Sequence, residues 1–297
     1  MEYCEPNHFR FTSTDTLQIE CVRWDQHGTV RGVIQIAHGL GEHIGRYAEL
    51  ADFLTGAGLV VYGNDHRGHG RTAQSSQQFG DFGRAGFDQL VQDMISLSAI
   101  AKGEHPGKPF ILLGHSMGSF AAQQYVLNYS SSIDGLVLFG SGALDSLARF
   151  AESVPAGQNP LALMDVPFEP VRTPFDWLSR DQTEVDKFMN DPLCFAALNP
   201  ESTRSFLAAS AVVSDPGRLR GIRHDLPIYL VSGSEDPVGQ QLAGLRILED
   251  RYRSAGITSI SHDFYPGGRH EMLHELNRSE VYSNLLAWLL SVLGKEP

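Results

Sequence analysis

The sequence predicts an α/β protein built on a mostly parallel sheet of eight strands, with helices on both faces of the sheet and a helical insert. Two segments of alternating polarity, residues 8–13 and 17–24, flank a Ser-Thr-Asp-Thr turn and indicate an opening antiparallel hairpin. Short apolar runs then alternate with stretches of helical periodicity, which is typical of parallel strands buried on both faces. Between residues 142 and 224 this alternation stops.

The chain therefore divides into a core, residues 1–141 and 225–297, and an insert, residues 142–224, which we expect to form a small helical lid between two strands. In the insert, Asn199 is a good N-cap for a helix that has Pro200 at its first position, and Pro216-Gly217 is expected to stop that helix. Further core strands are expected at residues 32–38, 58–62, 109–114, 133–139, 227–232 and 259–265, and core helices at 47–55, 86–101, 119–128, 240–254 and 279–293.

The composition is that of an ordinary globular protein, with 42% hydrophobic and 20% charged residues in 297. A net charge of −12 without a local run of Lys or Arg argues against nucleic acid as a partner, although an apolar patch can still rest weakly on a membrane surface. The three cysteines, Cys4, Cys21 and Cys194, show no disulfide or zinc spacing, so free thiols are expected. No secretory signal is visible, which favours the cytoplasm, and nothing indicates an oligomeric state.

Residues 114–118, Gly-His-Ser-Met-Gly, match the G-x-S-x-G pattern of a nucleophile elbow, in which a strand turns sharply into a helix and exposes a serine hydroxyl above the sheet edge. Gly114 and Gly118 leave the space that so tight a turn needs. A buried strand precedes the pattern and a helix follows it, as the elbow requires. This context favours Ser116 as a nucleophile over the alternative of a structural serine in a Gly-rich turn.

A nucleophilic serine needs a histidine base and an acid that orients it, in the chain order Ser, acid, His. Asp236 lies in the loop after the strand at 227–232, and His270 lies in the loop after the strand at 259–265. The sequence thus predicts a catalytic triad of Ser116, Asp236 and His270. The rivals fit less well: Glu235, which is expected to point the other way, His262, inside a strand, and His274, expected on the next helix.

An oxyanion formed at Ser116 needs two backbone N–H donors. Met117, the residue after the serine, is expected to supply one donor, and Leu40, in the loop after the strand at 32–38, the other. The alternative for this loop is a phosphate-binding turn, but it lacks a G-x-G-x-x-G pattern and a P-loop lysine.

Several segments in chain order, HGLGEHIGRY, GNDHRGHG, LLGHSMGS, GSEDPVG and YPGGRHEMLHE, resemble the monoglyceride lipase and lysophospholipase branch of the α/β-hydrolase fold, which is related to serine aminopeptidases. The resemblance covers nearly the whole chain and includes DWLSRDQTEVDKFMNDPLC in the insert. It implies the same triad and oxyanion donors, and chemistry without a cofactor. The chain departs from the family at Thr72, where serine is usual, and at Ser119, where a further glycine is common.

Other polar residues are expected to support this site rather than to bind a metal. The resemblance assigns His66 and His69, beside Asp65, to loop structure, so no metal site is expected. The residues expected to hold the oxyanion loop in shape are His38, Gly39, Glu42, His43 and Arg46, the last three by pairing at a helix start.

The insert carries many apolar residues, most of which are expected to form its own core while a minority line an apolar channel above Ser116: Phe150, Leu161, Leu163, Met164, Phe168, Phe175, Trp177, Phe188, Leu193, Phe195 and Phe206. Such a channel suits a fatty acyl chain. The expected activity is hydrolysis of a small-molecule carboxylic ester, a monoacylglycerol or a lysophospholipid, through an acyl-enzyme on Ser116. A carboxylesterase of small esters, a thioesterase or a proline-type aminopeptidase would use the same triad, and a non-catalytic binding protein is the alternative outside enzymes.

Overall fold

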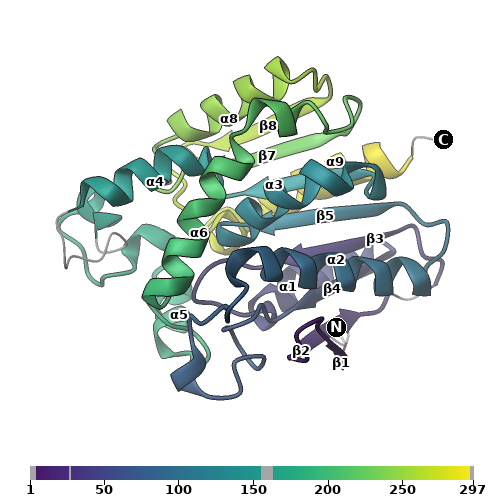
Figure 1. Cartoon of the computed structure of the whole chain (residues 1–297), viewed down its shortest axis with the longest axis horizontal. Helices are drawn as coiled ribbons and strands as arrows, with labels where there is room; N and C mark the ends of the chain where they lie inside the picture. The colour runs from purple at the N-terminus through teal and green to yellow at the C-terminus, as the bar shows by residue number, and fades with distance from the viewer. Residues whose placement is uncertain (1–4, 27, 155–162, 295–297) are drawn as a thin grey trace.

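A single sheet of eight strands forms the centre of the protein, seen in the computed structural model, which describes residues 5–26, 28–154 and 163–294 (Figure 1). The strand order is β1-β2-β4-β3-β5-β6-β7-β8, with β1 and β2 antiparallel to their neighbours and the other strands parallel. The predicted fold class is therefore confirmed. The strands are β1 Asn7–Thr12, β2 Gln18–Trp24, β3 Gly32–Ala37, β4 Leu59–Asn64, β5 Phe110–His115, β6 Gly135–Phe139, β7 Ile228–Gly233 and β8 Ile260–Tyr265.

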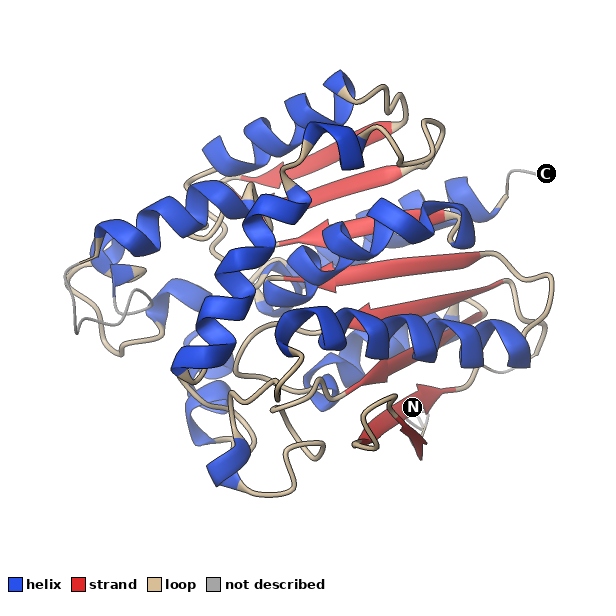
Figure 2. Ribbon diagram, viewed as in Figure 1, coloured by secondary structure: helices blue, strands red, loops and turns tan. Residues whose placement is uncertain are grey.

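Helices cover both faces of the sheet (Figure 2). Along β5, Phe110 and Leu112 pack into one apolar cluster while Ile111 and Leu113 pack into the other, because successive side chains point to opposite faces. Helices α2 (Gly86–Glu104), α3 (Met117–Tyr129) and α8 (Ala243–Ser254) cover the first face, and α1 (Ala48–Gly56) and α9 (Arg278–Leu293) cover the second. The central strands are thus buried on both sides, as their continuous apolar runs predicted.

The insert lies beyond the carboxyl ends of the parallel strands, toward which their arrowheads point (Figure 2). It contains α4 (Leu144–Ser153), α5 (Gln182–Asn190), α6 (Pro200–Val213), α7 (Pro216–Leu219) and the short 3-10 turns η5 (Val166–Phe168) and η6 (Asp176–Leu178). The predicted start of α6 is confirmed: the Asn199 side chain accepts a hydrogen bond from the Ser202 N–H, and Pro200 occupies the first turn. The carboxyl ends of parallel strands are where such sheets present their binding residues.

The predicted end of α6 is confirmed, whereas the predicted start of α8 is wrong. Helix α6 ends at Val213, before Pro216-Gly217, and Pro216 then begins α7, which Asp215 caps by accepting from the Arg218 N–H. Helix α8 begins at Ala243 rather than at residue 240, because Gln240, Gln241 and Leu242 all adopt left-handed backbone conformations. Periodicity could not reveal this turn, since none of the three is a glycine.

Two further expectations concern cysteines and the C-terminal helix. Cys21 and Cys194 are free thiols, whereas Cys4, like Leu161 of the insert, lies outside the described residues. The apolar stretch near the C-terminus forms part of α9, whose Leu285 and Leu289 are fully buried. Among the described helices, none has both the length and the apolar character that crossing a membrane would need.

Candidate active site

Ser116 lies in a strained backbone conformation between β5 and α3. Its φ of 51° and ψ of −120° fall in a region that residues with a side chain rarely adopt, and such strain persists only where the surrounding packing imposes it. The Ser116 N–H donates to the Phe139 carbonyl on β6 at 2.9 Å, which ties the turn to the neighbouring strand. Between Phe110 and Gln123, Ser116 is the only residue that is not buried. The turn therefore presents this one side chain to the exterior of the sheet.

The two glycines of the turn are required by close backbone contacts. A Cβ at Gly118 would lie 2.1 Å from the Ala37 carbonyl oxygen at the end of β3, and a Cβ at Gly114 would lie 2.5 Å from the Gly118 carbonyl oxygen. Both distances are far below any van der Waals contact, so only glycine fits at either position. The packing thus shows why the sequence motif has glycine at both positions: a side chain at either one would collide with the backbone.

Asp236 and His270 meet in the loops that follow β7 and β8. The His270 Nδ1 lies 2.9 Å from Asp236 Oδ1, and both side chains are almost completely buried. The Asp236 carboxylate also accepts from the Val238 N–H at 2.9 Å and from the Ser232 hydroxyl at 3.2 Å. These bonds fix the carboxylate, so Nδ1 carries the ring proton and Nε2 is left as a basic lone pair. No described residue bonds to His270 Nε2 or to the Ser116 hydroxyl, and both residues line one cavity.

The surroundings of His270 favour its protonated form. Burial alone would lower the pKa of His270, but the Asp236 charge and hydrogen bond, with weaker contributions from Glu271 and Glu42, raise the pKa above its ordinary value. The ring is packed beside Trp177, with the ring centroids 5.0 Å apart, and beside His115, at 4.9 Å. An imidazolium formed here would thus be stabilised without moving the ring.

The rival groups lie elsewhere. Glu235 is exposed while Asp236 is fully buried, as expected from their alternation in the loop. His262 lies on the exposed side of β8, near Glu249 at 3.4 Å. His274 belongs to the short 3-10 turn η7 (Met272–His274) rather than to α9, and its Nε2 lies 3.0 Å from the Arg46 carbonyl.

His38 fixes the orientation of the peptide between Gly39 and Leu40. The His38 Nε2 accepts from the His66 N–H at 2.9 Å, so Nδ1 carries the proton and donates to the Gly39 carbonyl at 2.7 Å. Burial lowers the pKa of His38 to about 4, which keeps this neutral tautomer at neutral pH. The N–H of a trans peptide points opposite to its C=O, so the Leu40 N–H is turned away from His38. No described residue accepts from the Leu40 or Met117 N–H.

Glu42 organises the other side of the same loop. Its Oε1 accepts from the Gly39 N–H at 2.6 Å, the Tyr47 hydroxyl at 2.8 Å and His115 Nδ1 at 3.1 Å. Its Oε2 accepts from Arg46 at 2.7 Å, in the pairing that the sequence predicted. Burial alone would raise the pKa of Glu42, but the Arg46 charge and the His115 hydrogen bond lower it well below its ordinary value. Glu42 is therefore a buried carboxylate.

Arg46 also binds a second buried carboxylate, Glu271. The Arg46 guanidinium donates to both Glu271 oxygens, at 2.7 and 2.8 Å, and its charge outweighs burial to lower the pKa of Glu271. Two carboxylates thus share one guanidinium, so the cluster of Glu42, Arg46 and Glu271 carries a net negative charge.

His43 does not join this cluster. Its Nδ1 accepts from the Gly45 N–H at 3.2 Å and its Nε2 lies 2.9 Å from Asp191 of the insert, so the expected three-way pairing at the helix start is wrong for His43. Within the described residues, one group has metal-ligand atoms within 4.8 Å of one another: His43, Asp191 and Cys194. Both His43 nitrogens already have protein partners. His66 and His69 are buried beside His38 and form no such group in the described chain.

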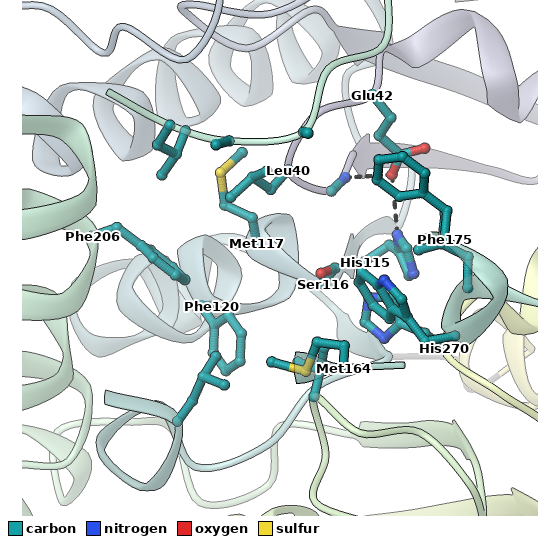
Figure 3. A pocket seen from close by; sticks show the side chains of 18 of the residues that line it. Leu40, Glu42, His115, Ser116, Met117, Phe120, Met164, Phe175, Phe206 and His270 are labelled. Carbon is teal, nitrogen blue, oxygen red and sulfur yellow. Dashed lines mark hydrogen bonds and ion pairs between the residues drawn. The ribbon is translucent and has the colours of Figure 1, made fainter. Parts of the chain in front are cut away.

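A cavity of about 210 Å³ opens above Ser116. In Figure 3 the Ser116 hydroxyl lies at its centre, with Phe120 and Phe206 toward one end and Glu42, His115 and Phe175 toward the other. Most of the apolar insert residues that the sequence singled out line this cavity, so the expectation that only a minority would do so is wrong: Phe150, Met164, Phe175, Trp177, Phe188, Phe195 and Phe206. Among the described residues that line it there is no Lys or Arg.

Two residues of this site were not singled out by the sequence. His115 stands at a variable position of the elbow motif, and Glu271 directly follows His270. The adjacency of Glu271 to His270 was the one available signal. Trp177 was among the apolar insert residues singled out, but its contact with the His270 ring could not be predicted, because it depends on how the insert folds back.

Comparison with known proteins identifies the relatives of this chain. A family model described as "Serine aminopeptidase, S33" matches residues 28–277. A monoacylglycerol lipase of Mycolicibacterium smegmatis is 32% identical, over 91% of this chain and 92% of that protein, and the human monoglyceride lipase is 29% identical, over 89% and 87%. Among solved structures, a thermostable carboxyl esterase of Bacillus coagulans in complex with glycerol has a TM-score of 0.87 at 28% identity, covering 97% of this chain and 99% of that one.

The fold and these relatives define the class of the protein, a serine hydrolase that acts on small-molecule esters. The chain belongs to the serine aminopeptidase S33 family of α/β-hydrolases.

The contact between Asp236 and His270 leads to a testable prediction about the pKa of His270. In Asp236→Asn the neutral amide no longer stabilises the imidazolium, so the pKa of His270 falls and its protonation occurs at lower pH than in the wild type. Histidine NMR titration measures this shift. Asp263→Asn, on the neighbouring strand β8, removes a carboxylate that bonds to Tyr229 and should leave the His270 titration unchanged. A His270 pKa that is unchanged or raised in Asp236→Asn would contradict the assignment.

Proposed function

We propose that the protein hydrolyses monoacylglycerols through an acyl-enzyme on Ser116, with Asp236 and His270 completing the triad and the Leu40 and Met117 N–H groups binding the oxyanion. The observation that carries the proposal is the division of the cavity: Phe120 and Phe206 lie toward one end, and Glu42 and His115 lie beside Phe175 toward the other, which we call the polar end, with Ser116 between them (Figure 3). A monoacylglycerol has the same division, with an ester between an acyl chain and a diol.

In the proposed mechanism, His270 Nε2 takes the Ser116 proton as Oγ attacks the ester carbonyl. The carbonyl oxygen becomes an oxyanion held by the Leu40 and Met117 N–H groups, both of which lack another partner among the described residues. The imidazolium, stabilised by Asp236, then protonates the leaving glycerol oxygen as the C–O bond breaks. Water repeats the sequence on the acyl-enzyme and releases the fatty acid. No metal or cofactor enters these steps.

The apolar end is the proposed acyl site. Phe120 on α3 and Phe206 on α6 pack against each other, with ring centroids 5.8 Å apart, and both line the cavity. Helix α4 packs against α6 and adds Leu147, Phe150 and Ala151 to the same lining. Burying a methylene here contributes about 0.8 kcal/mol, so an acyl chain of several carbons gains substantial affinity.

The polar end is the proposed site of the leaving alcohol. Glu42, Glu271 and His115 line it, while the Arg46 charge stays behind the two carboxylates and outside the lining. Carboxylates and an imidazole can bond to hydroxyl groups, but the excess negative charge opposes an anionic headgroup, since like charges brought together cost several kcal/mol. This argues for a neutral monoacylglycerol over a lysophospholipid, whose headgroup carries a phosphate.

The relatives support the same substrate class. Monoacylglycerol lipases from a bacterium and from human match this chain over most of their length, and the esterase from Bacillus coagulans was solved with glycerol bound. The family also contains aminopeptidases, which cleave amides instead of esters. An aminopeptidase would place an ammonium group against Glu42 or Glu271, so amide substrates belong in the test.

We further propose that the insert, residues 142–224, is a lid that covers the acyl site. It supplies most of the cavity wall, and Val166 and Met189 on it are about half exposed despite their apolar side chains. Such residues can rest weakly on a lipid surface and bring the cavity to its substrate. The free thiols Cys21 and Cys194 fit a reducing compartment, so the proposal places the enzyme in the cytoplasm.

A chain-length series tests the acyl site. With acetyl, butyryl, octanoyl and oleoyl glycerol, kcat/KM should rise about fourfold for each methylene that enters the apolar end, until the end is filled. Ala151→Trp should fill that end and reduce hydrolysis of the long esters selectively. The control is Glu152→Trp, the exposed neighbour on α4, which should leave the series unchanged. Equal efficiency from acetyl to oleoyl would contradict an apolar acyl site.

A headgroup comparison tests the polar end. Oleoylglycerol and oleoylglycerol phosphate share acyl chain and glycerol, and in the same neutral micelles the uncharged ester should react at least about tenfold faster in kcat/KM, because the phosphate meets an excess of carboxylates. Glu271→Gln removes the excess negative charge and should therefore bring the kcat/KM values of the two esters closer together. Equal rates for both esters, or faster cleavage of a prolyl amide, would overturn the proposed substrate.

A further inference from the structure

A short segment of the insert, residues 176–181, is bonded directly to the loop that carries His270; we call it the strap. The His270 N–H donates to the Trp177 carbonyl at 3.4 Å, and the Glu271 N–H donates to the Leu178 carbonyl at 2.7 Å. The Ser179 hydroxyl donates to the His274 carbonyl at 2.9 Å. The strap thus lies beside the His270 loop, residues 267–276, and is hydrogen-bonded to it, although it belongs to the insert.

Glu275 lies at the centre of this junction and is completely buried. Its Oε1 accepts from the backbone N–H of Arg180 at 3.0 Å and from that of Arg269 at 3.1 Å. Its Oε2 accepts from Arg180 Nε at 3.0 Å and from the Leu276 N–H at 2.8 Å. Each carboxylate oxygen therefore has two donors, and these donors come from both sides of the junction.

One backbone donor to Glu275 lies directly next to the proposed base in the sequence. Arg269 directly precedes His270, and its backbone N–H is held by Glu275 while the next N–H, that of His270, is held by the strap. The loop is tied to the acid as well, because the Gly268 carbonyl accepts from the Glu235 N–H at 2.9 Å, next to Asp236. The His270 backbone is thus fixed on one side to the Asp236 loop and on the other to Glu275 and the strap.

We propose that Glu275 is a positioning residue for His270, whose buried carboxylate joins the strap to the His270 loop and so holds the imidazole in register with Ser116. This inference rests on the proposed role of His270 as the base. It also means that the strap is part of the catalytic framework, and that any opening of the insert must occur outside residues 176–181. An error of one ångström in the position of such a base costs about a hundredfold in rate.

The substitution Glu275→Gln is a direct test. The amide keeps one acceptor oxygen but turns an NH2 group toward two N–H donors, so half of the hydrogen bonds are lost. We expect kcat to fall roughly tenfold to a hundredfold with KM changed less than about threefold. A change in KM alone would mean that Glu275 shapes the cavity and does not position the base, and would overturn the inference, as would an unchanged kcat in the folded variant.

If Glu275→Gln fails to fold, a pair of milder variants tests whether Glu275 positions His270. Arg180→Met removes the side-chain bond to Glu275, and Arg251→Met removes another arginine pair between core and insert, that of Arg251 with Asp145 at 2.6 Å. The two arginines are similarly exposed, at 32% and 28%. Arg180→Met should lower kcat several-fold while Arg251→Met leaves it unchanged. An equal loss in both, or none in Arg180→Met, would contradict a positioning role.

Each variant is assayed with oleoylglycerol and with nitrophenyl butyrate, an activated ester without a glycerol headgroup. If the wild type cleaves the nitrophenyl ester but not oleoylglycerol, the proposed substrate fails while the kcat comparison still decides the role of Glu275. If His270→Ala retains the wild-type kcat on both esters, the proposed base fails, and the inference about Glu275 falls with it. Failure of the inference alone leaves both wild-type activities and their dependence on His270 intact.

Discussion

The close approach of the turn after β5 to the end of β3 is the contact on which the rest of the site depends. A side chain at Gly118 would lie 2.1 Å from the Ala37 carbonyl, so the turn fits only because that position is bare. The same packing holds Ser116 in its strained conformation and sets the loop after β3 beside it, where a Cβ at Gly39 would lie 3.2 Å from that of Ser116. The proposed nucleophile and the proposed oxyanion loop are thus brought together by one steric constraint.

Buried charged side chains also hold the site in shape. Asp236 stabilises a proton on His270, and Glu42 and Glu271 both pair with Arg46 nearby. Burying carboxylates is costly unless each oxygen has donors, and for Glu42 and Glu275 the donors include backbone N–H groups of the loops beside the site. Glu42 holds the oxyanion loop in this way, and Glu275 holds the His270 loop. The charges therefore stabilise the loop geometry, and the proposed preference for an uncharged headgroup rests on the same charges.

Sequence reasoning was strong where local chemistry decides the outcome. The apolar runs predicted the sheet, the Gly-x-Ser-x-Gly spacing predicted the turn at Ser116, and Asn199 with Pro200 predicted the start of α6. It was weak where tertiary contacts decide. The partnership of His43 with Asp191 and the position of Trp177 against His270 each depend on segments distant in the chain. For the same reason the number of insert residues that line the cavity was underestimated.

The central claim, that Ser116 becomes acylated during turnover, is tested most directly by intact-mass analysis of an acid-quenched reaction with nitrophenyl octanoate. An activated leaving group makes acylation fast, so the acyl-enzyme should accumulate. We expect a mass increase of one octanoyl group, located on Ser116 by peptide mapping and absent from Ser116→Ala. An octanoyl group on another residue, or full turnover by Ser116→Ala, would contradict it.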